Sequence, residues 1–201
     1  MKGKIRKNLD IAFFYLKQLY THLLFAVAIT GFFIIVGYSA VFIEPELSRT
    51  LFDEFVSSLN LVEGMSSFDL FLKIFSNNSL AIFIAIVGGF LFGILPVYVL
   101  VANGLVIGIF LNLFLIELSP LVFLVGIMPH GVIEIPVLLL ASAVGLLAGQ
   151  RSLKWLIWGR KFDFIKALKD ALLVFAILLI PLLVASFIES FITPWLLSLV
   201  V

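Results

Sequence analysis

Between Lys73 and Glu117 the chain runs for 43 residues without a charged side chain: IFSNNSLAIFIAIVGGFLFGILPVYVLVANGLVIGIFLNLFLI. A helix rises 1.5 Å per residue and the hydrocarbon core of a bilayer is about 30 Å thick, so one crossing takes about 20 apolar residues. The run is too long for one transmembrane helix and has the right length for two. Pro96 divides it, and we expect spans over 79–95 and 97–116 with a turn near Pro96.

The composition of the whole chain also indicates a membrane protein. Of its 201 residues, 63% are hydrophobic and 12% are charged, whereas soluble domains average about 45–50% and about 25%. These values exclude a soluble enzyme, a secreted disulfide-rich domain and a disordered chain. A net charge of +1 gives no reason to expect nucleic-acid binding, and the absence of cysteine excludes disulfides and thiolate sites.

Three further spans follow from the remaining apolar runs. The first covers 23–43, and the last begins near Ala171 and ends near Glu189. Between them, prolines and a histidine interrupt the region 118–136, which predicts a broken or re-entrant segment followed by a full span over 131–150. The predicted fold is therefore all-α, a polytopic transmembrane helical bundle of about five spans that forms a single membrane domain over 1–201.

Lysine and arginine predict the orientation of these spans. Eleven of the 13 basic residues lie in the segments 1–20 and 151–170, whereas the loop 44–78 is mainly acidic. Because positively charged loops stay in the cytoplasm, we expect both basic segments to be cytoplasmic and the loop to be extracytoplasmic. Five crossings of the plasma membrane then place the N-terminus in the cytoplasm and the C-terminus outside.

Three segments outside the spans have apolar residues at helical spacing. They are 4–20, 46–59 and 160–170. Such segments form amphipathic helices that lie in the membrane interface, and Trp155 and Trp158 suit the same zone. We expect them to connect the spans along the membrane surface.

Small residues recur four positions apart in three spans and are candidates for close helix packing. This packing can lie within one bundle or form a subunit interface. The residues with this spacing are Gly89, Gly93, Gly104, Gly108, Ala141, Gly145 and Gly149.

Glu134 is the most informative polar residue because an ionisable group is costly in hydrocarbon. It follows His130 by four positions, so a helix would place both side chains on one face. The pair could bind a cation, relay a proton or cap a helix. The alternative is a structural pair stabilised by the helix dipole. A zinc site would need a third ligand that the sequence does not identify, so no metal or cofactor is assigned.

Several of these residues together resemble the stage II sporulation protein M family. The pattern consists of Asn77-Asn78, Gly88-Gly89, Gly93, Asn103-Gly104 with Gly108, Pro129-His130-Gly131-x-x-Glu134, and Ala141 with Gly145. The family's marked positions correspond to Asn103, Gly104, Pro129, His130, Gly131 and Glu134, which we take as a candidate polar site inside the membrane. The resemblance implies a multi-pass membrane protein, and for the family's namesake a scaffold that recruits cell-wall-degrading partners.

The sequence contains no motif of established catalytic chemistry, so we expect a protein that is not an enzyme. A scaffold or assembly subunit is the first hypothesis. The alternative is a small ion or solute transporter or channel that uses the polar site around His130 and Glu134. We expect the lipid bilayer, membrane or envelope proteins and further copies of the chain, for example in a dimer, as partners.

Overall fold

The computed structural model describes residues 2–46, 49–51, 53, 65–118, 120–126 and 128–200. Within these residues the chain is helical and contains no strand. Five helical stretches are long and apolar enough to cross a membrane, namely Lys17–Ile43, Ser67–Phe90, Ile94–Ile116, Met128–Trp158 and Phe164–Leu197. The predicted all-helical, five-span architecture is therefore confirmed.

The spans consist of α-helices with short irregular helices at their ends. The α-helices are α1 (Lys2–Ile43), α3 (Ser67–Val87), α4 (Ile94–Leu113), α5 (Pro120–Gly126), α6 (Met128–Trp158), α7 (Phe164–Phe187) and α8 (Thr193–Leu197). A 3-10 turn, η1, covers Gly88–Phe90, and two π-helical segments, η2 and η3, cover Phe114–Leu118 and Ile188–Ile192.

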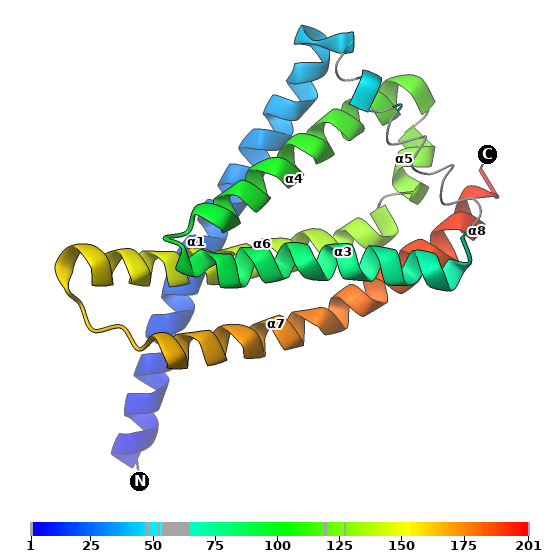
Figure 1. Cartoon of the computed structure of the whole chain (residues 1–201). Helices are drawn as coiled ribbons and strands as arrows, with labels where there is room; N and C mark the ends of the chain where they lie inside the picture. Colours follow the sequence, from blue (N-terminus) through cyan, green and yellow to red (C-terminus); the bar gives the residue numbers. More distant parts are fainter. Residues whose placement is uncertain are drawn as a thin grey trace.

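Two groups of helices make up the bundle (Figure 1). Helices α3, α6 and α7 lie side by side, while α1 and α4 pack along each other and cross the first group obliquely. The colours of Figure 1 show that α1 runs parallel to α4 and α3 runs parallel to α6, whereas α7 runs opposite to α6. Successive spans thus alternate in direction, as five consecutive crossings require.

The turn between the second and third spans lies earlier than the sequence predicts. It is formed at Leu91–Gly93, where Phe92 and Gly93 have φ angles of 57° and 81°. Gly93 adopts this left-handed conformation without a steric penalty. Pro96 therefore does not make the turn but lies in the first helical turn of α4, where its missing N–H has no helical partner to lose.

The second span also begins earlier than residue 79. Helix α3 starts at Ser67 because the Ser66 hydroxyl accepts a hydrogen bond of 3.2 Å from the Asp69 amide. This N-cap satisfies one of the free amides of the first turn. Lys73 consequently lies inside α3, in its second turn.

Two of the predicted interfacial segments are continuous with spans instead of forming separate helices. Segment 4–20 is not a separate helix, since no proline or glycine lies between Lys4 and Thr30 and α1 continues through it into the first span. In segment 160–170, the residues up to Asp163 form a turn, and Asp163 caps α7 by accepting from the Lys166 amide at 3.0 Å. Most of segment 46–59 lies outside the described residues.

The region 118–136 contains a break, as expected, but the long helix starts earlier than residue 131. The short helix α5 is followed by α6, which begins at Met128 and includes Pro129 in its first turn. A proline is tolerated there because first-turn amides have no helical acceptor. The tail after Glu189 likewise continues the last span through η3 into α8.

Helices α3 and α6 touch backbone to backbone at glycines. A Cβ atom built on Gly89 would lie 2.2 Å from the Gly145 carbonyl oxygen, and one on Gly145 would lie 1.9 Å from the Ala85 carbonyl oxygen. Next to them, a Cβ atom on Gly149 would lie 2.3 Å from the Gly93 nitrogen. Only glycine leaves room for these approaches, which increase the dispersion contacts between helices in lipid.

Helices α1 and α4 form a second close pair in the same way. A Cβ atom on Gly108 would lie 2.1 Å from the Ile34 carbonyl oxygen, and one on Gly104 would lie 2.9 Å from the Thr30 carbonyl oxygen. The Asn112 side-chain amide, which is fully buried, donates to the Tyr38 carbonyl oxygen at 3.0 Å. Glycine packing and one interhelical hydrogen bond thus hold this pair together.

Two apolar clusters complete the core. The larger one joins α3, α4, α6 and α7 and contains Ile82, Ala85, Ile86, Val99, Val137, Ala141, Ala171, Leu178 and Leu182. The smaller one lies where α1, α4 and α6 meet and contains Ala26, Leu100 and Leu146. The smaller cluster packs the pair α1 and α4 against α6 and thereby against the group of α3, α6 and α7.

Replacing Gly145 by alanine should destabilise the bundle, because the new methyl group would overlap the α3 backbone. Overpacking of this kind costs roughly 1–3 kcal/mol, so the melting temperature in detergent should fall. Gly31→Ala is the matched control, since a Cβ atom on Gly31 meets nothing within 4 Å. The melting temperature of both variants is measured by tryptophan fluorescence during heating. Equal melting temperatures for the two would contradict the proposed role of the glycine contact.

Candidate functional site

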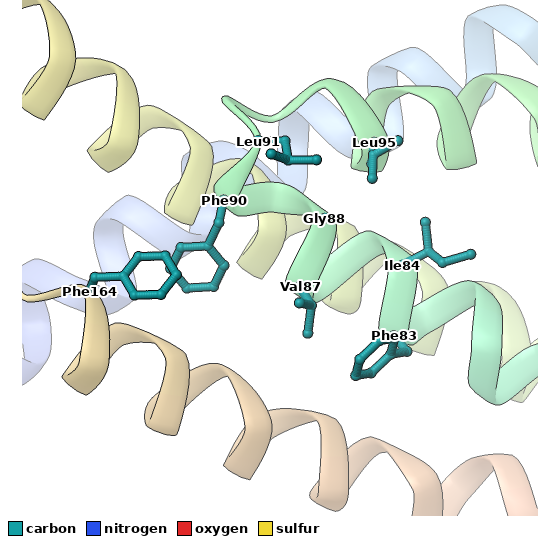
Figure 2. A pocket seen from close by; sticks show the side chains of 8 residues that line it. All are labelled: Phe83, Ile84, Val87, Gly88, Phe90, Leu91, Leu95 and Phe164. Carbon is teal, nitrogen blue, oxygen red and sulfur yellow. The ribbon is translucent and has the colours of Figure 1, made fainter.

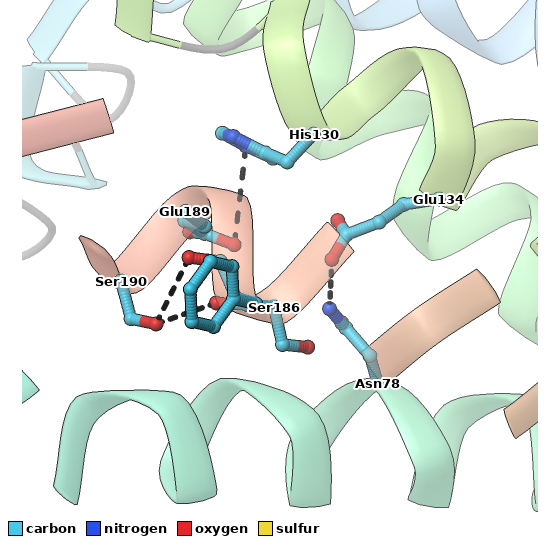
Figure 3. A network of polar contacts seen from close by, with 7 residues as sticks. Asn78, His130, Glu134, Ser186, Glu189 and Ser190 are labelled. Carbon is cyan, nitrogen blue, oxygen red and sulfur yellow. Dashed lines mark hydrogen bonds and ion pairs between the residues drawn. The ribbon is translucent and has the colours of Figure 1, made fainter. Parts of the chain in front are cut away.

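Three ionisable side chains from two spans meet at one end of the bundle. They are His130 and Glu134 in the first two turns of α6, and Glu189 just beyond α7. One ligand atom from each lies within 4.8 Å of those from the other two. Figure 3 shows the His130 and Glu134 side chains extending from α6 toward the segment that carries Glu189.

Local structure places the two α6 residues on one face. Because α6 starts at Met128, His130 and Glu134 are separated by one helical turn and their side chains are neighbours. Gly131, between them, is buried. Both residues lie near the N-terminus of the helix, where the helix dipole favours a carboxylate.

Glu189 is presented by the π-helical segment η3 rather than by regular α-helix. Within this segment the Ser190 hydroxyl donates to the Ser186 carbonyl oxygen at 2.7 Å, so the backbone of the wider turn is partly satisfied by a side chain. Single π-helical turns are rare and occur frequently at functional sites. The irregular turn therefore agrees with a functional position for Glu189.

A third span contributes Asn78 from α3. Its side-chain amide donates a hydrogen bond to Glu134 Oε1, as Figure 3 shows. On the other side, His130 Nε2 lies 4.0 Å from Glu189 Oε2. The polar residues consequently link α3 to α6 and α6 to the end of α7.

The site carries an excess of acidic groups. The His130 side chain is 12% exposed and that of Glu189 is 31% exposed. In the part of the chain that the structure describes, neither Glu134 nor Glu189 pairs with a lysine or arginine. Two carboxylates that lack a lysine or arginine partner among the described residues are costly inside a spanning bundle, so the arrangement favours a bound cation or bound protons.

Two polar atoms beside the carboxylates have no hydrogen-bond partner. One is His130 Nδ1 and the other is the hydroxyl of Ser186, a residue that is fully buried. In Figure 3 the Ser186 side chain turns toward Asn78, next to Glu134. Buried polar atoms are normally paired, so the site has unused capacity to bind a polar ligand.

The structure brings together only part of the predicted polar site. The first two turns of α6 contain four of its members, namely Pro129, His130, Gly131 and Glu134. Asn103 is instead in the middle of α4, where its amide donates to the Val99 carbonyl oxygen of the same helix at 2.8 Å. The neighbouring Gly104 contacts α1. These two α4 positions therefore serve helix structure and packing.

The site predicted from the sequence lacks Asn78 and Glu189. Asn78 is part of the Asn77-Asn78 pair, and Glu189 is an ionisable residue at the end of an apolar run. Both signals were visible. To assign both residues to the site on α6, one must know which helices are neighbours, and a single sequence does not give this information.

An apolar groove of about 460 Å³ lies elsewhere, between the end of α3, η1, the start of α4 and the start of α7 (Figure 2). Its lining includes Phe83, Phe90 and Phe164 and none of the site residues. Its apolar lining suits a lipid acyl chain rather than an ion.

Comparison with known proteins agrees with these features. The chain matches the family described as stage II sporulation protein M over residues 21–194. The protein is a member of this family. The matched range contains three of the spans completely and most of the first and last, and it includes the residues Asn78, His130, Glu134 and Glu189.

Two curated relatives of this family member come from Methanocaldococcus jannaschii. The uncharacterized protein MJ0793 is 29% identical over 126 residues, which cover 62% of this chain and 71% of the relative. The uncharacterized protein MJ0706 is 26% identical over 145 residues, which cover 71% of this chain and 64% of the relative. No solved structure matches the chain. The relatives' names state no activity.

Asn78→Leu should lower the stability of the bundle because it removes the hydrogen bond to Glu134. Interhelical hydrogen bonds in membranes contribute about 0.6 kcal/mol on average and at most about 1.7 kcal/mol. Asn77→Leu is the control, since Asn77 is exposed. A double-mutant cycle with Glu134→Met, which removes the acceptor oxygens, should show coupling for Asn78 and none for Asn77 when thermal unfolding is measured in detergent. Identical cycles for both asparagines would rule out the contribution of this bond.

Proposed function

We propose that this family member is a transport protein for a cation or a small cationic solute, and that His130, Glu134 and Glu189 form its binding site. The observation that carries this proposal is the meeting of three ionisable side chains from two spans, which have no lysine or arginine partner among the described residues. Ionisable residues inside spans commonly mark ion pathways. We further propose that the protein is not an enzyme.

Irregular helices around the site support a transport role. The break between α5 and α6 precedes His130, and the π-helical segment η3 carries Glu189. In many transporters the binding site lies where helices are interrupted, because free backbone groups and helix ends assist ligand binding there. Asn78 adds a neutral polar group from a third span.

The distribution of charge supports an orientation in the plasma membrane. We propose that the basic segments 1–20 and 151–170 are cytoplasmic and that the C-terminus is outside. The site lies at the start of α6, whereas Arg151 and Lys154 lie near its end. A cation would then reach the site from the outer side, and it would need a further step to reach the cytoplasm.

Self-association would complete such a path. Five spans form a thin bundle, and the glycines of the small-residue pattern are already in contact with other helices of the same chain. We propose a homo-oligomer, for example a dimer, whose subunits meet through exposed apolar helix faces and not through these glycines.

Transport by the purified protein in liposomes tests the proposal. Flux of protons or of divalent metal ions should exceed that of protein-free liposomes and should fall to that level in Glu134→Gln and Glu189→Gln, which keep the side-chain volume but remove the charge. Glu46→Gln is the matched control because Glu46 is exposed and outside the site. Unchanged flux in both site variants would contradict the transport proposal.

A membrane scaffold is the second candidate, because the resemblance to this family implies that role for the family's namesake. Such a protein would recruit membrane or envelope partners through the loop 44–78 or the basic segment 151–170. The turn between α6 and α7 presents Arg160 and Lys161 as exposed residues. These side chains are accessible to an acidic surface of a partner.

Co-purification from native membranes separates the two candidates. For a scaffold, the same partner should return in repeated purifications and should be lost when Arg160 and Lys161 are both replaced by glutamine, because the basic surface disappears. Lys17→Gln is the control, an exposed lysine on α1 that lies outside both segments. A preparation that lacks any reproducible partner yet supports flux would exclude the scaffold.

A further inference from the structure

We infer that His130, Glu134 and Glu189 form a binding site for a divalent transition metal ion of the zinc or manganese class. The inference uses the same site as the proposed transport function. It requires only equilibrium binding, so it can be tested apart from transport. The three residues supply one imidazole nitrogen and two carboxylate oxygens.

The geometry is close to that of a metal site. Imidazole nitrogens and carboxylate oxygens bind zinc at about 2.0–2.2 Å, which places tetrahedral donors about 3.3 Å apart. The three donor atoms here lie within 4.8 Å of one another. Small side-chain rotations of His130 and Glu189, which are 4.0 Å apart and not hydrogen-bonded to each other, bring them to that separation.

Charge favours a dication. The two negative charges of the carboxylates equal in magnitude the charge of one divalent cation. In the described part of the chain no lysine or arginine pairs with either carboxylate. Within a membrane-spanning bundle such an excess of negative charge is unfavourable until a cation or protons neutralise it. A divalent ion achieves this with a single ligand.

Neighbouring residues supply the support that metal ligands need. Asn78 donates to Glu134 Oε1 and leaves Oε2 of that carboxylate available. The fully buried Ser186 turns its unpartnered hydroxyl toward Asn78 (Figure 3). Outer residues that orient ligands contribute substantially to metal affinity.

The donor types select the metal. Imidazole suits zinc, iron, nickel and copper, whereas carboxylates also suit manganese. Calcium and magnesium prefer sites made entirely of oxygen. Soft copper(I) prefers sulfur ligands such as cysteine, and the chain contains no cysteine. Three protein ligands leave at least one position for water or for an incoming ligand. An open position also allows the ion to leave, as transport requires.

Titration of the purified full-length protein with Co²⁺ and Zn²⁺ in detergent tests the site. Co²⁺ should produce visible absorption bands that saturate near one ion per chain, and Zn²⁺ should abolish them. Asn78→Leu should weaken binding by about 10–100-fold, as loss of an orienting residue does. His130→Gln, Glu134→Gln and Glu189→Gln should weaken it further. Calorimetry with Ca²⁺ and Mg²⁺ should show no comparable binding.

His22→Gln is the matched control, because the chain has only two histidines and His22 lies on α1, with Nδ1 2.7 Å from the Gln18 carbonyl oxygen. Size-exclusion chromatography shows whether each variant is folded, and Co²⁺ release from the unaltered protein by a chelator needs no variant. Absence of saturable Co²⁺ binding, or loss of binding in His22→Gln, would overturn the inference. Proton flux without metal binding would also overturn it but retain the transport proposal, whereas metal binding without flux would support the inference and reject transport.

Discussion

Backbone contact between α3 and α6 is the constraint on which the arrangement of this protein depends. Gly89 lies against Gly145, and Gly145 lies against the backbone of Ala85. Because the two helices are parallel, this contact also sets their register along their whole length. Gly89 and Gly145 are 56 positions apart, and so are Asn78 and Glu134, which meet three helical turns away. The same packing that brings the helices together therefore delivers Asn78 to the carboxylate.

The polar site is expensive for a bundle held together mainly by apolar and glycine contacts. Ionisable groups lose their hydration when helices assemble in lipid. Here one hydrogen bond from a neutral amide and one nearby imidazole accompany two carboxylates. A purely structural role would be served equally by apolar side chains of similar size. The placement of these groups beside a helix break and a π-helical turn is consistent with a site that exchanges a ligand.

Much of the fold was predictable, because each span must satisfy its backbone N–H and C=O groups within its own helix and must be long enough to cross the bilayer. Length and charge therefore located five spans. They did not locate the ends, since these depend on local hydrogen bonds and backbone conformation: Ser66 caps α3 well before the apolar run, and Gly93 makes the turn instead of Pro96. Likewise α1 continues through an amphipathic segment because nothing in that segment interrupts a helix.

The amino-acid sequence alone established a five-span helical membrane protein, and it identified His130 and Glu134 as neighbours because both lie on one helix at a spacing of four. Local spacing carries that information. The partners Asn78 and Glu189 come from helices 56 and 55 positions away from Glu134, and their meeting depends on how helices pack. Tertiary structure also separated Asn103 from this site, because α4 pairs with α1 and turns its asparagine to its own backbone. Packing between helices, rather than the properties of any one helix, assembles the site.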